Sequence, residues 1–283
     1  MAVNDVRGTL EPFVLFESSG VIAVFKPAGL PTQSPAGIDS AEAWLRRRHH
    51  CRSDAGHAMG SAGGYVGIPH RLDRAVSGVL LMATTPRAAR KLSRQFERRQ
   101  IIKTYVAIVA CTGSDKGSAE SLERGCEQGV EWRDLIEKVP DQARARIVQE
   151  SGSAAREAVT HATLLAKLFG NDFFGRRQGP LCDHWLVELS PLTGRMHQLR
   201  VQAAWRGMPV AGDFLYGNGD HCRTADEQRQ QPIALHALSI QFADPDTGAM
   251  KTVASPLPDF WPEEVSGMGL RVGLTELRAI RRG

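Results

Sequence analysis

The chain has 283 residues, of which 42% are hydrophobic and 23% charged, so it can bury a sizeable core as one large domain or two smaller ones. Its formal net charge of +4 permits a polyanionic partner without demanding one. No run of about 18 apolar residues is present, which excludes a membrane-spanning helix. The five cysteines are odd in number and scattered, which argues against a disulfide framework or zinc ribbon and favours the cytoplasm.

The chain begins with a predicted β-hairpin. Short apolar runs at residues 13–16 and 21–25 flank a Glu-Ser-Ser-Gly sequence, whose residue types favour a tight turn. Two prolines and a glycine at residues 27–31 predict a stiff, exposed loop. Lys26 at the start of this loop could contact a phosphate or could equally be a solvated lysine.

A helix is expected next, at residues 40–50. It ends in the basic run Arg-Arg-Arg-His-His, which suits the negative end of the helix dipole. With Cys51 and His57 nearby a metal site can be imagined, but the spacing matches no familiar ligand pattern. We therefore interpret the run as structural.

Residues 69–83 join a charged loop to an apolar run. The loop reads Pro-His-Arg-Leu-Asp-Arg, and the run at residues 79–83 is short and bounded, as a buried strand would be. Asp73 lies between Arg71 and Arg74 and should be ionised, because a nearby opposite charge favours the charged form. These residues alone leave open whether Asp73 forms a structural ion pair or acts chemically.

A second helix is predicted from Pro86 to about Arg99. Thr85 is a suitable N-cap, and proline is favoured at the first helical position. Apolar side chains mark a core-facing stripe, and six cations occupy most of the remaining surface. That surface is either a solvated face or a binding surface for a phosphate backbone. The six cations are Arg87, Arg90, Lys91, Arg94, Arg98 and Arg99.

The remainder of the chain is mostly strand-like. Residues 101–110 are β-branched and apolar, which predicts a core strand that contains Tyr105. Residues 132–148 suggest a hairpin with its turn at Pro140 and Asp141. Alternating or apolar residues predict further strands at 157–168, 184–189 and 233–242.

A third helix should begin at about His197, directly after the turn Thr193-Gly194-Arg195. Arg195 then lies at a helix N-terminus, where the dipole is already positive. A cation in that position favours an anionic neighbour, either a carboxylate or a phosphate.

These motifs, in this order, resemble the RluA-type pseudouridine synthases. Residues 70–78 match the family signature His-Arg-Leu-Asp-Arg-x-x-Ser-Gly, and the resemblance covers about residues 14–260. The chain departs from the family pattern at Ala75-Val76, where an acid and a threonine are usual, and at Met196, where threonine is usual. The other similar segments are residues 26–30, 103–107, 193–201, and 212–213 with 235–237.

The resemblance implies an α+β fold with a bent, mainly antiparallel mixed sheet flanked by helices. We expect an N-terminal extension at residues 1–12, a catalytic domain at 13–262 without an S4-type domain, and a C-terminal tail at 263–283. We further expect a monomer that needs neither a metal nor a cofactor.

The resemblance also implies the function of an RNA pseudouridine synthase, which isomerises a specific unpaired uridine of rRNA or tRNA after base flipping. By residue match, Asp73 is the catalytic acid, Tyr105 stacks on the target base and Arg195 pairs with the acid. Arg71 would fill the space left by the flipped base, and Leu199 would line the pocket. The further residues expected to contact RNA are Lys26, His70, Arg74, Arg90 and Lys91.

Two other functions remain open at this point. One is an RNA-binding protein of the same fold that has lost catalysis, although Asp73, Tyr105 and Arg195 are all present. The other is a hydrolase of small molecules that uses Asp73 with His70 or His197. Neither a Gly-x-Ser-x-Gly motif nor paired catalytic carboxylates support the hydrolase.

Overall fold

The computed structural model describes residues 11–35, 37–54, 64–111, 120–123, 125, 128–150, 152, 154–168, 184–217 and 231–268. Most of the expected N-terminal extension and of the expected C-terminal tail lie outside these residues. His57, which entered the metal-site alternative, lies outside them as well.

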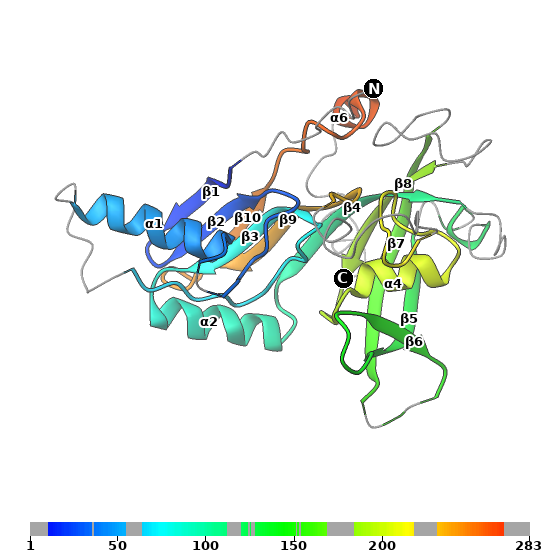
Figure 1. Cartoon of the computed structure of the whole chain (residues 1–283), viewed down its shortest axis with the longest axis horizontal. Coiled ribbons are helices and arrows are strands. Elements are labelled where there is room, and N and C mark those ends of the chain that lie inside the picture. The colour runs from blue at the N-terminus through cyan, green and yellow to red at the C-terminus, as the bar shows by residue number, and fades with distance from the viewer. Residues whose placement is uncertain are drawn as a thin grey trace.

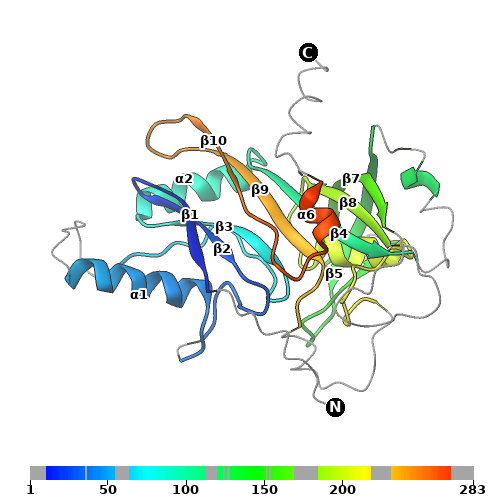
Figure 2. The same cartoon turned by 90° about the horizontal axis from the view of Figure 1, so that it is seen from above.

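Ten strands form one continuous bent sheet, and its path runs β1-β2-β3-β9-β4-β8-β7-β5-β6, with β10 beside β9. The described strand pairs are antiparallel except β3 with β9, which is parallel. Figures 1 and 2 show β1, β2, β3, β9 and β10 in one half of the molecule and β4 to β8 in the other. The expected α+β class is confirmed. The strands are β1 (Phe13–Ser18), β2 (Val21–Lys26), β3 (Ser77–Ala83), β4 (Ile102–Ala110), β5 (Val130–Lys138), β6 (Ala145–Val148), β7 (Arg156–Leu168), β8 (His184–Pro191), β9 (Leu235–Ala243) and β10 (Met250–Ala254).

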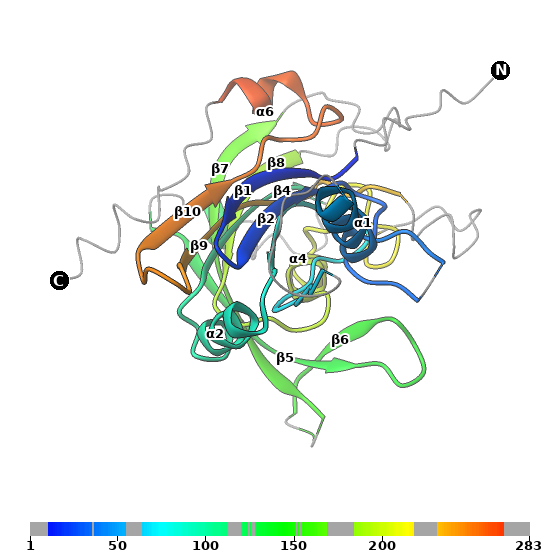
Figure 3. The same ribbon diagram turned by 90° about the vertical axis from the view of Figure 1, so that its left-hand side faces the viewer.

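Helices α1 (Ala41–Asp54) and α2 (Pro86–Glu97) cover opposite faces of the first half of the sheet (Figure 3). Successive side chains of a strand point to opposite faces, so the wholly buried β2 packs against both helices, one on each face. Ile22 packs in the cluster that holds Leu45 of α1, whereas Val21 packs with Leu92 of α2. The predicted hairpin at the N-terminus and both predicted helices are therefore confirmed.

The second half of the sheet packs against α4 (Gln198–Trp205), the predicted third helix. Its core includes Leu186 and Leu189 from β8 and Ala203 from α4. The short helix α6 (Glu263–Gly267) falls within the expected tail, yet its Val265 is wholly buried in the same core. The ordered packing thus extends a few residues beyond the predicted boundary at 262.

Gly78 allows strands β3 and β9 to meet closely. Its φ of +116° lies in the region that favours glycine, and a Cβ at this position would lie 2.2 Å from the Ala237 carbonyl oxygen on β9. Beside it, the Ser77 hydroxyl lies 2.8 Å from Nδ1 of the buried His236. The Ser-Gly pair in the signature therefore fixes β3 against β9, and this fixes the loop that carries Asp73.

Candidate active site

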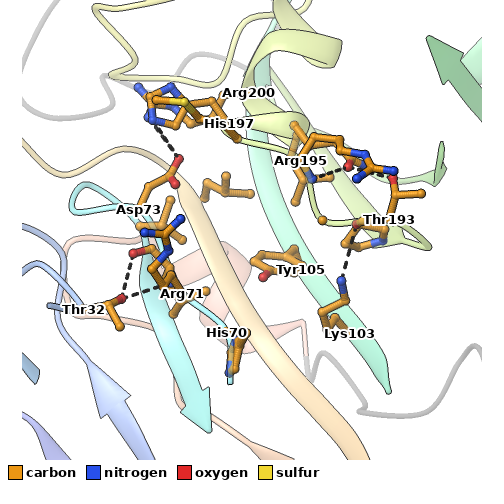
Figure 4. Close-up of a pocket in the computed structure, with 18 of the residues that line it drawn as sticks. Thr32, His70, Arg71, Asp73, Lys103, Tyr105, Thr193, Arg195, His197 and Arg200 are labelled. Atoms are coloured by element: carbon orange, nitrogen blue, oxygen red, sulfur yellow. Dashed lines mark hydrogen bonds and ion pairs between the residues drawn. The ribbon is translucent and has the colours of Figure 1, made fainter. Parts of the chain in front are cut away.

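A cleft of about 1250 Å³ lies where the two halves of the sheet meet. Residues 69–76, strand β4 and the turn at 191–200 line it, as Figure 4 shows for part of its wall. Cations outnumber acids among the lining residues, so the cleft is suited to a polyanionic ligand. The lining cations are Arg71, Arg74, Arg99, Lys103, Lys138, Arg195 and Arg200, and the lining acids are Asp73, Glu97 and Asp141.

The loop that presents Asp73 is held from below by two polar side chains. The Thr32 hydroxyl donates to the Leu72 carbonyl at 2.9 Å and accepts from the Leu72 N–H at 3.1 Å. The Lys26 ammonium donates to the Arg74 carbonyl at 3.3 Å. These bonds fix the backbone on both sides of Asp73, whose side chain is 30% exposed and faces the cleft.

Lys26 corrects the expectation of a phosphate contact. Its side chain is fully buried, and its ammonium also donates to the carbonyls of Pro27 and Leu30 at 2.8 and 2.7 Å. Burial lowers the pKa of Lys26 to about 7, against the opposing effect of the Asp73 carboxylate. The stiff loop after β2 encloses the lysine, because its carbonyls need a donor once they are buried.

Arg200 on α4 is the cation that pairs with Asp73. One of its Nη atoms lies 3.1 Å from Oδ2 of Asp73, and the rest of the guanidinium binds both oxygens of Asp213 at 2.6 and 2.8 Å. Arg200 is 8% exposed and Asp213 1% exposed, so the arginine is fixed by a buried bidentate pair. The carboxylates of Asp213 and Asp73 raise the pKa of Arg200 against the effect of its burial. A permanent cation is therefore fixed beside the Asp73 carboxylate and helps to orient it.

Arg195 does not pair with Asp73, which corrects the sequence-based assignment. Its Nε donates to the Glu157 carbonyl on β7 at 2.9 Å, and its backbone N–H donates to Gln198 Oε1 at 3.0 Å. The turn is bound to β7 by these contacts, so the guanidinium points away from the acid, as Figure 4 shows. The helix it precedes does begin at Gln198, but Arg195 uses a backbone carbonyl where we expected an anion.

His197 gives Asp73 a second polar neighbour. It adopts a left-handed conformation (φ 52°) at the N-cap of α4, and its Nε2 lies 3.8 Å from Asp73 Oδ2. Its Nδ1 lies 2.8 Å from the Tyr216 hydroxyl, which accepts from the Ala145 N–H at 2.8 Å. Nδ1 therefore faces the Tyr216 hydroxyl and Nε2 faces Asp73, so a ring proton on Nε2 would be directed toward the acid. Burial lowers the pKa of His197, so the neutral ring is favoured.

Tyr105 lies on β4 beside the cleft, as its predicted role requires, and Figure 4 shows its ring between Asp73 and Lys103. The register of β4 against β9 shifts between Thr104 and Tyr105, and such a bulge re-aims a side chain. Burial, and then the Asp73 charge, raise the pKa of Tyr105, so its hydroxyl is protonated at neutral pH. Burial also lowers the pKa of Lys103 to about 8.

The other expected contact residues fall into two groups. Arg71 and Arg74 are exposed at the rim of the cleft, and Arg74 donates to the Gly29 carbonyl at 2.8 Å. His70 also lines the cleft, but its Nε2 accepts the Leu81 N–H at 2.9 Å, and burial lowers its pKa to about 3. Leu199 lines the cleft from the core.

Arg90 and Lys91 lie outside the residues that line the cleft. Arg90 is exposed on α2, and the Lys91 ammonium donates to the Pro245 carbonyl in the turn between β9 and β10. Neither residue can contact a base held beside Asp73.

The structure also shows the surroundings of the residues that depart from the family pattern, Ala75-Val76 and Met196. Ala75 and Val76 are 7% and 3% exposed and pack in the core of the second half. Apolar side chains therefore replace polar ones at a buried site and leave no unpaired polar group there. Met196 is at the rim of the cleft and 36% exposed.

Sequence reasoning did not assign a role to Arg200, Asp213 or Tyr216. Arg200 could have been recognised because it interrupts an apolar helical run, Leu199, Val201 and Ala203, and a cation in such a run needs a buried partner. The contacts of Asp213 and Tyr216 with Arg200 depend on the path of the chain after α4. No local sequence pattern shows that path.

Among the described residues, no group of three or more His, Cys, Asp or Glu side chains is arranged to hold a metal ion. No helix in the described part of the chain is both long and apolar enough to cross a membrane.

The cleft holds a half-buried acid, and its mainly basic lining suits a polyanionic ligand. The chain belongs to the RNA pseudouridylate synthase family, whose model matches residues 20–205. Members of this family are isomerases that act on RNA. The predicted relation to the RluA-type enzymes is confirmed.

Three relatives illustrate the range of the match. The tRNA pseudouridine synthase C of Salmonella typhimurium is 31% identical over 91% of this chain and 90% of its own length. The dual-specificity RNA pseudouridine synthase RluA of Haemophilus ducreyi is 27% identical over 89% of this chain and 97% of its own length. The tRNA pseudouridine synthase C of Pectobacterium carotovorum subsp. carotovorum is 29% identical over 94% of this chain, and the chain spans 65% of that protein's length.

A solved structure shares the fold. Human RNA pseudouridylate synthase domain containing 1 superposes with a TM-score of 0.61 at 20% identity, over 100% of this chain and 98% of that one. At this level of identity the likeness concerns the fold alone.

Proposed function

We propose that this RNA pseudouridine synthase isomerises a specific uridine of tRNA, with Asp73 as the catalytic carboxylate. The observation that carries the proposal is the placement of Asp73: it is half-buried in a basic cleft and held beside the fixed cation of Arg200. The two other acids that line the cleft, Glu97 and Asp141, are exposed. A carboxylate with a fixed cation is ionised and oriented, as a nucleophile or base must be.

The reaction requires the glycosidic bond between N1 of uracil and C1′ of ribose to break, and a bond between C5 and C1′ to form. Uridine and pseudouridine are isomers, so no atom is added: the proton lost from C5 is balanced by a proton gained at N1. An ionised Asp73 can add to C1′, as in retaining glycosidases, or can take a proton from the sugar. Both routes use a carboxylate that stabilises positive charge developing on the ribose.

The proposal includes base flipping. Asp73 faces the interior of the cleft, which supports a target uridine that leaves its stack, at a cost of about a few kcal/mol that is least for an unpaired nucleotide. Tyr105 offers the uracil a flat apolar surface, and Arg71 at the rim is placed to occupy the vacated stack.

The names of two relatives favour tRNA over rRNA as the substrate. We further propose that the protein acts as a monomer in the cytoplasm. The test uses tRNA and rRNA transcripts that carry tritium at C5 of uridine, incubated with the purified protein. We expect tritium release from a tRNA and pseudouridine at one position. Release from neither RNA would refute the proposal, and release from rRNA alone would refute the choice of tRNA.

A further inference from the structure

Helix α2 carries a row of arginines outside the cleft. Arg87, Arg90, Arg94 and Arg98 follow one another at spacings of three, four and four residues, and all four are exposed. At 100° per residue they fall within an arc of about 80°, opposite the buried Ala88 and Leu92, and they extend for about 17 Å along the helix axis. We call these four residues the α2 ridge.

The α2 ridge is not neutralised by the protein. None of its four guanidinium groups forms an ion pair within the described part of the chain. The helix has no acid in its first turn, so Arg87 also stands against the positive end of the dipole. Like charges three and four residues apart destabilise a helix. The dipole favours Arg94 in the last turn of the helix but not Arg87 in the first, so an anion along the ridge accounts for the whole row.

Helix α1 shows that the chain neutralises a basic helix elsewhere. Arg46, Arg47 and Arg48 pair with Glu42, Asp39 and Glu17, at 2.7, 2.8 and 3.7 Å. The basic run that ends the predicted first helix is thus matched by acids, and the basic face of α2 is not.

The α2 ridge is continuous with the cleft. Directly after Arg98, Arg99 adopts a left-handed conformation (φ 56°) and lines the cleft together with Phe96 and Glu97. The chain then enters β4, which follows α2 directly in Figure 1 and carries Tyr105 of the cleft. Arg99 therefore extends the row of arginines from the end of the ridge into the cleft.

The chemistry of the ridge favours paired over unpaired RNA. Proteins that bind single strands combine cations with aromatic side chains on which bases stack. Phe96 is the aromatic residue of α2, and it stacks on His70 at 4.8 Å, away from the ridge. Arginines without aromatic neighbours suit the phosphates of a duplex, whose bases are not available.

We propose that the α2 ridge binds the backbone phosphates of a base-paired stem of the substrate RNA, next to the unpaired uridine held in the cleft. This rests on the proposed function for the choice of RNA. The ridge would orient the RNA and supply affinity, and the cleft would supply the chemistry.

The experiment compares two double variants of the full chain. Arg90→Gln with Arg94→Gln removes two charges from the ridge, and Arg46→Gln with Arg47→Gln removes two charges from α1 as a matched control. The probes are an unmodified tRNA transcript, a blunt RNA duplex of about 16 base pairs, and oligouridine of about 20 nucleotides. Dissociation constants are measured over a range of salt concentrations, and tritium release is measured at saturating tRNA.

We expect the α2 variant to bind tRNA and duplex about tenfold more weakly at low salt. The slope of log K against log salt should be reduced by about 1.4 to 1.8, because each of the two lost phosphate contacts contributes about 0.7–0.9. Its binding of oligouridine and its rate at saturating tRNA should match the wild type, and the α1 variant should match the wild type throughout.

An unchanged salt slope for the duplex would overturn the inference, as would an equal loss of oligouridine binding or an equal loss in the α1 variant. Failure of the proposed function would be seen separately, as the absence of tritium release by the wild-type protein. In that case the measurements with the RNA duplex still test the α2 ridge.

Discussion

The arginines at the floor of the cleft and those at its rim differ in what holds them. Arg200 at the floor is 8% exposed and binds two carboxylates through three hydrogen bonds. Arg71 and Arg74 at the rim are exposed, and Arg195 bonds a backbone carbonyl. A fixed, desolvated cation can control the charge and orientation of a reacting acid, whereas an exposed one can follow a mobile phosphate. The comparison predicts that changes at the floor affect the rate of reaction and changes at the rim affect RNA affinity.

The largest effect is expected from Asp73→Asn. The amide cannot act as a nucleophile or base, so pseudouridine formation should fall about a thousandfold or more, which corresponds to roughly 4 kcal/mol of barrier. RNA affinity should change little. Single-turnover tritium release measures the rate, and Glu97→Gln, which alters an exposed acid of the same cleft, is the control. Appreciable turnover by Asp73→Asn, or an equal loss in the control, would contradict the assignment.

Asp213→Asn should separate stability from chemistry at the floor. It leaves the buried Arg200 without its bidentate partner, and removal of one member of a buried pair costs about 3–5 kcal/mol of unfolding free energy. Arg200 still reaches Asp73, so the rate at saturating RNA should fall by only about tenfold, or roughly 1.4 kcal/mol. Urea unfolding and tritium release on the same preparation measure the two effects. Unaltered stability would show that Asp213 does not hold the arginine.

Tyr216→Phe should act through the histidine. The variant loses the hydroxyl that accepts from the Ala145 N–H and faces His197 Nδ1, which costs about 1–3 kcal/mol of unfolding free energy. If the hydroxyl donates to Nδ1 in the wild type, its loss frees the ring proton of His197 from Nε2, and the rate should fall severalfold. Nitrogen chemical shifts of the ring report the tautomer, and the exposed Tyr65, changed to Phe, serves as control. A single Nε2–H tautomer in the Tyr216 variant would refute the positioning role.

Lys26→Met should have the smallest effect on RNA binding, because the buried ammonium never reaches a phosphate. Its effect is on stability and depends on pH. The folded chain releases the Lys26 proton near pH 7 and the unfolded chain near pH 10.5, so the unfolded state binds more protons in between. The unfolding free energy of the wild type should therefore rise relative to the variant between pH 7 and 10, by at most about 1.4 kcal/mol per pH unit. If the variant instead reduces the salt slope of RNA binding, Lys26 contacts a phosphate and this account of the residue is wrong.

The sequence predicted much of the fold, because the signals for it are local. Apolar periodicity, the Thr85-Pro86 start and the turn residues located the hairpin at the N-terminus, the three helices and the core strands. The parallel contact between β3 and β9 could not be derived, since it joins residues about 160 apart through the space that Gly78 leaves open.

The candidate site could be predicted only for residues that lie in recognisable sequence motifs. Asp73 and Tyr105 were placed in one cleft by matching the signature. Arg195 was assigned to the pair by residue match, and its position at a helix start agreed with that role. The burial of Arg200 against Asp213 could not be read from the local sequence. Lys26 and the basic end of α1 were ambiguous for the same reason: carbonyls and acids contributed by other segments satisfy them in the folded chain.

The most direct test measures single-turnover pseudouridine formation by Arg200→Gln and Arg195→Gln at saturating RNA, with thermal melts to exclude unfolded protein. Both changes remove one guanidinium, and the two residues lie five positions apart. If the buried Asp73–Arg200 pair is the reactive centre, the Arg200 variant should lose about a hundredfold or more in rate, roughly 2.7 kcal/mol, and the Arg195 variant should remain within about threefold of the wild type. A large loss at Arg195 with a normal rate at Arg200 would contradict it.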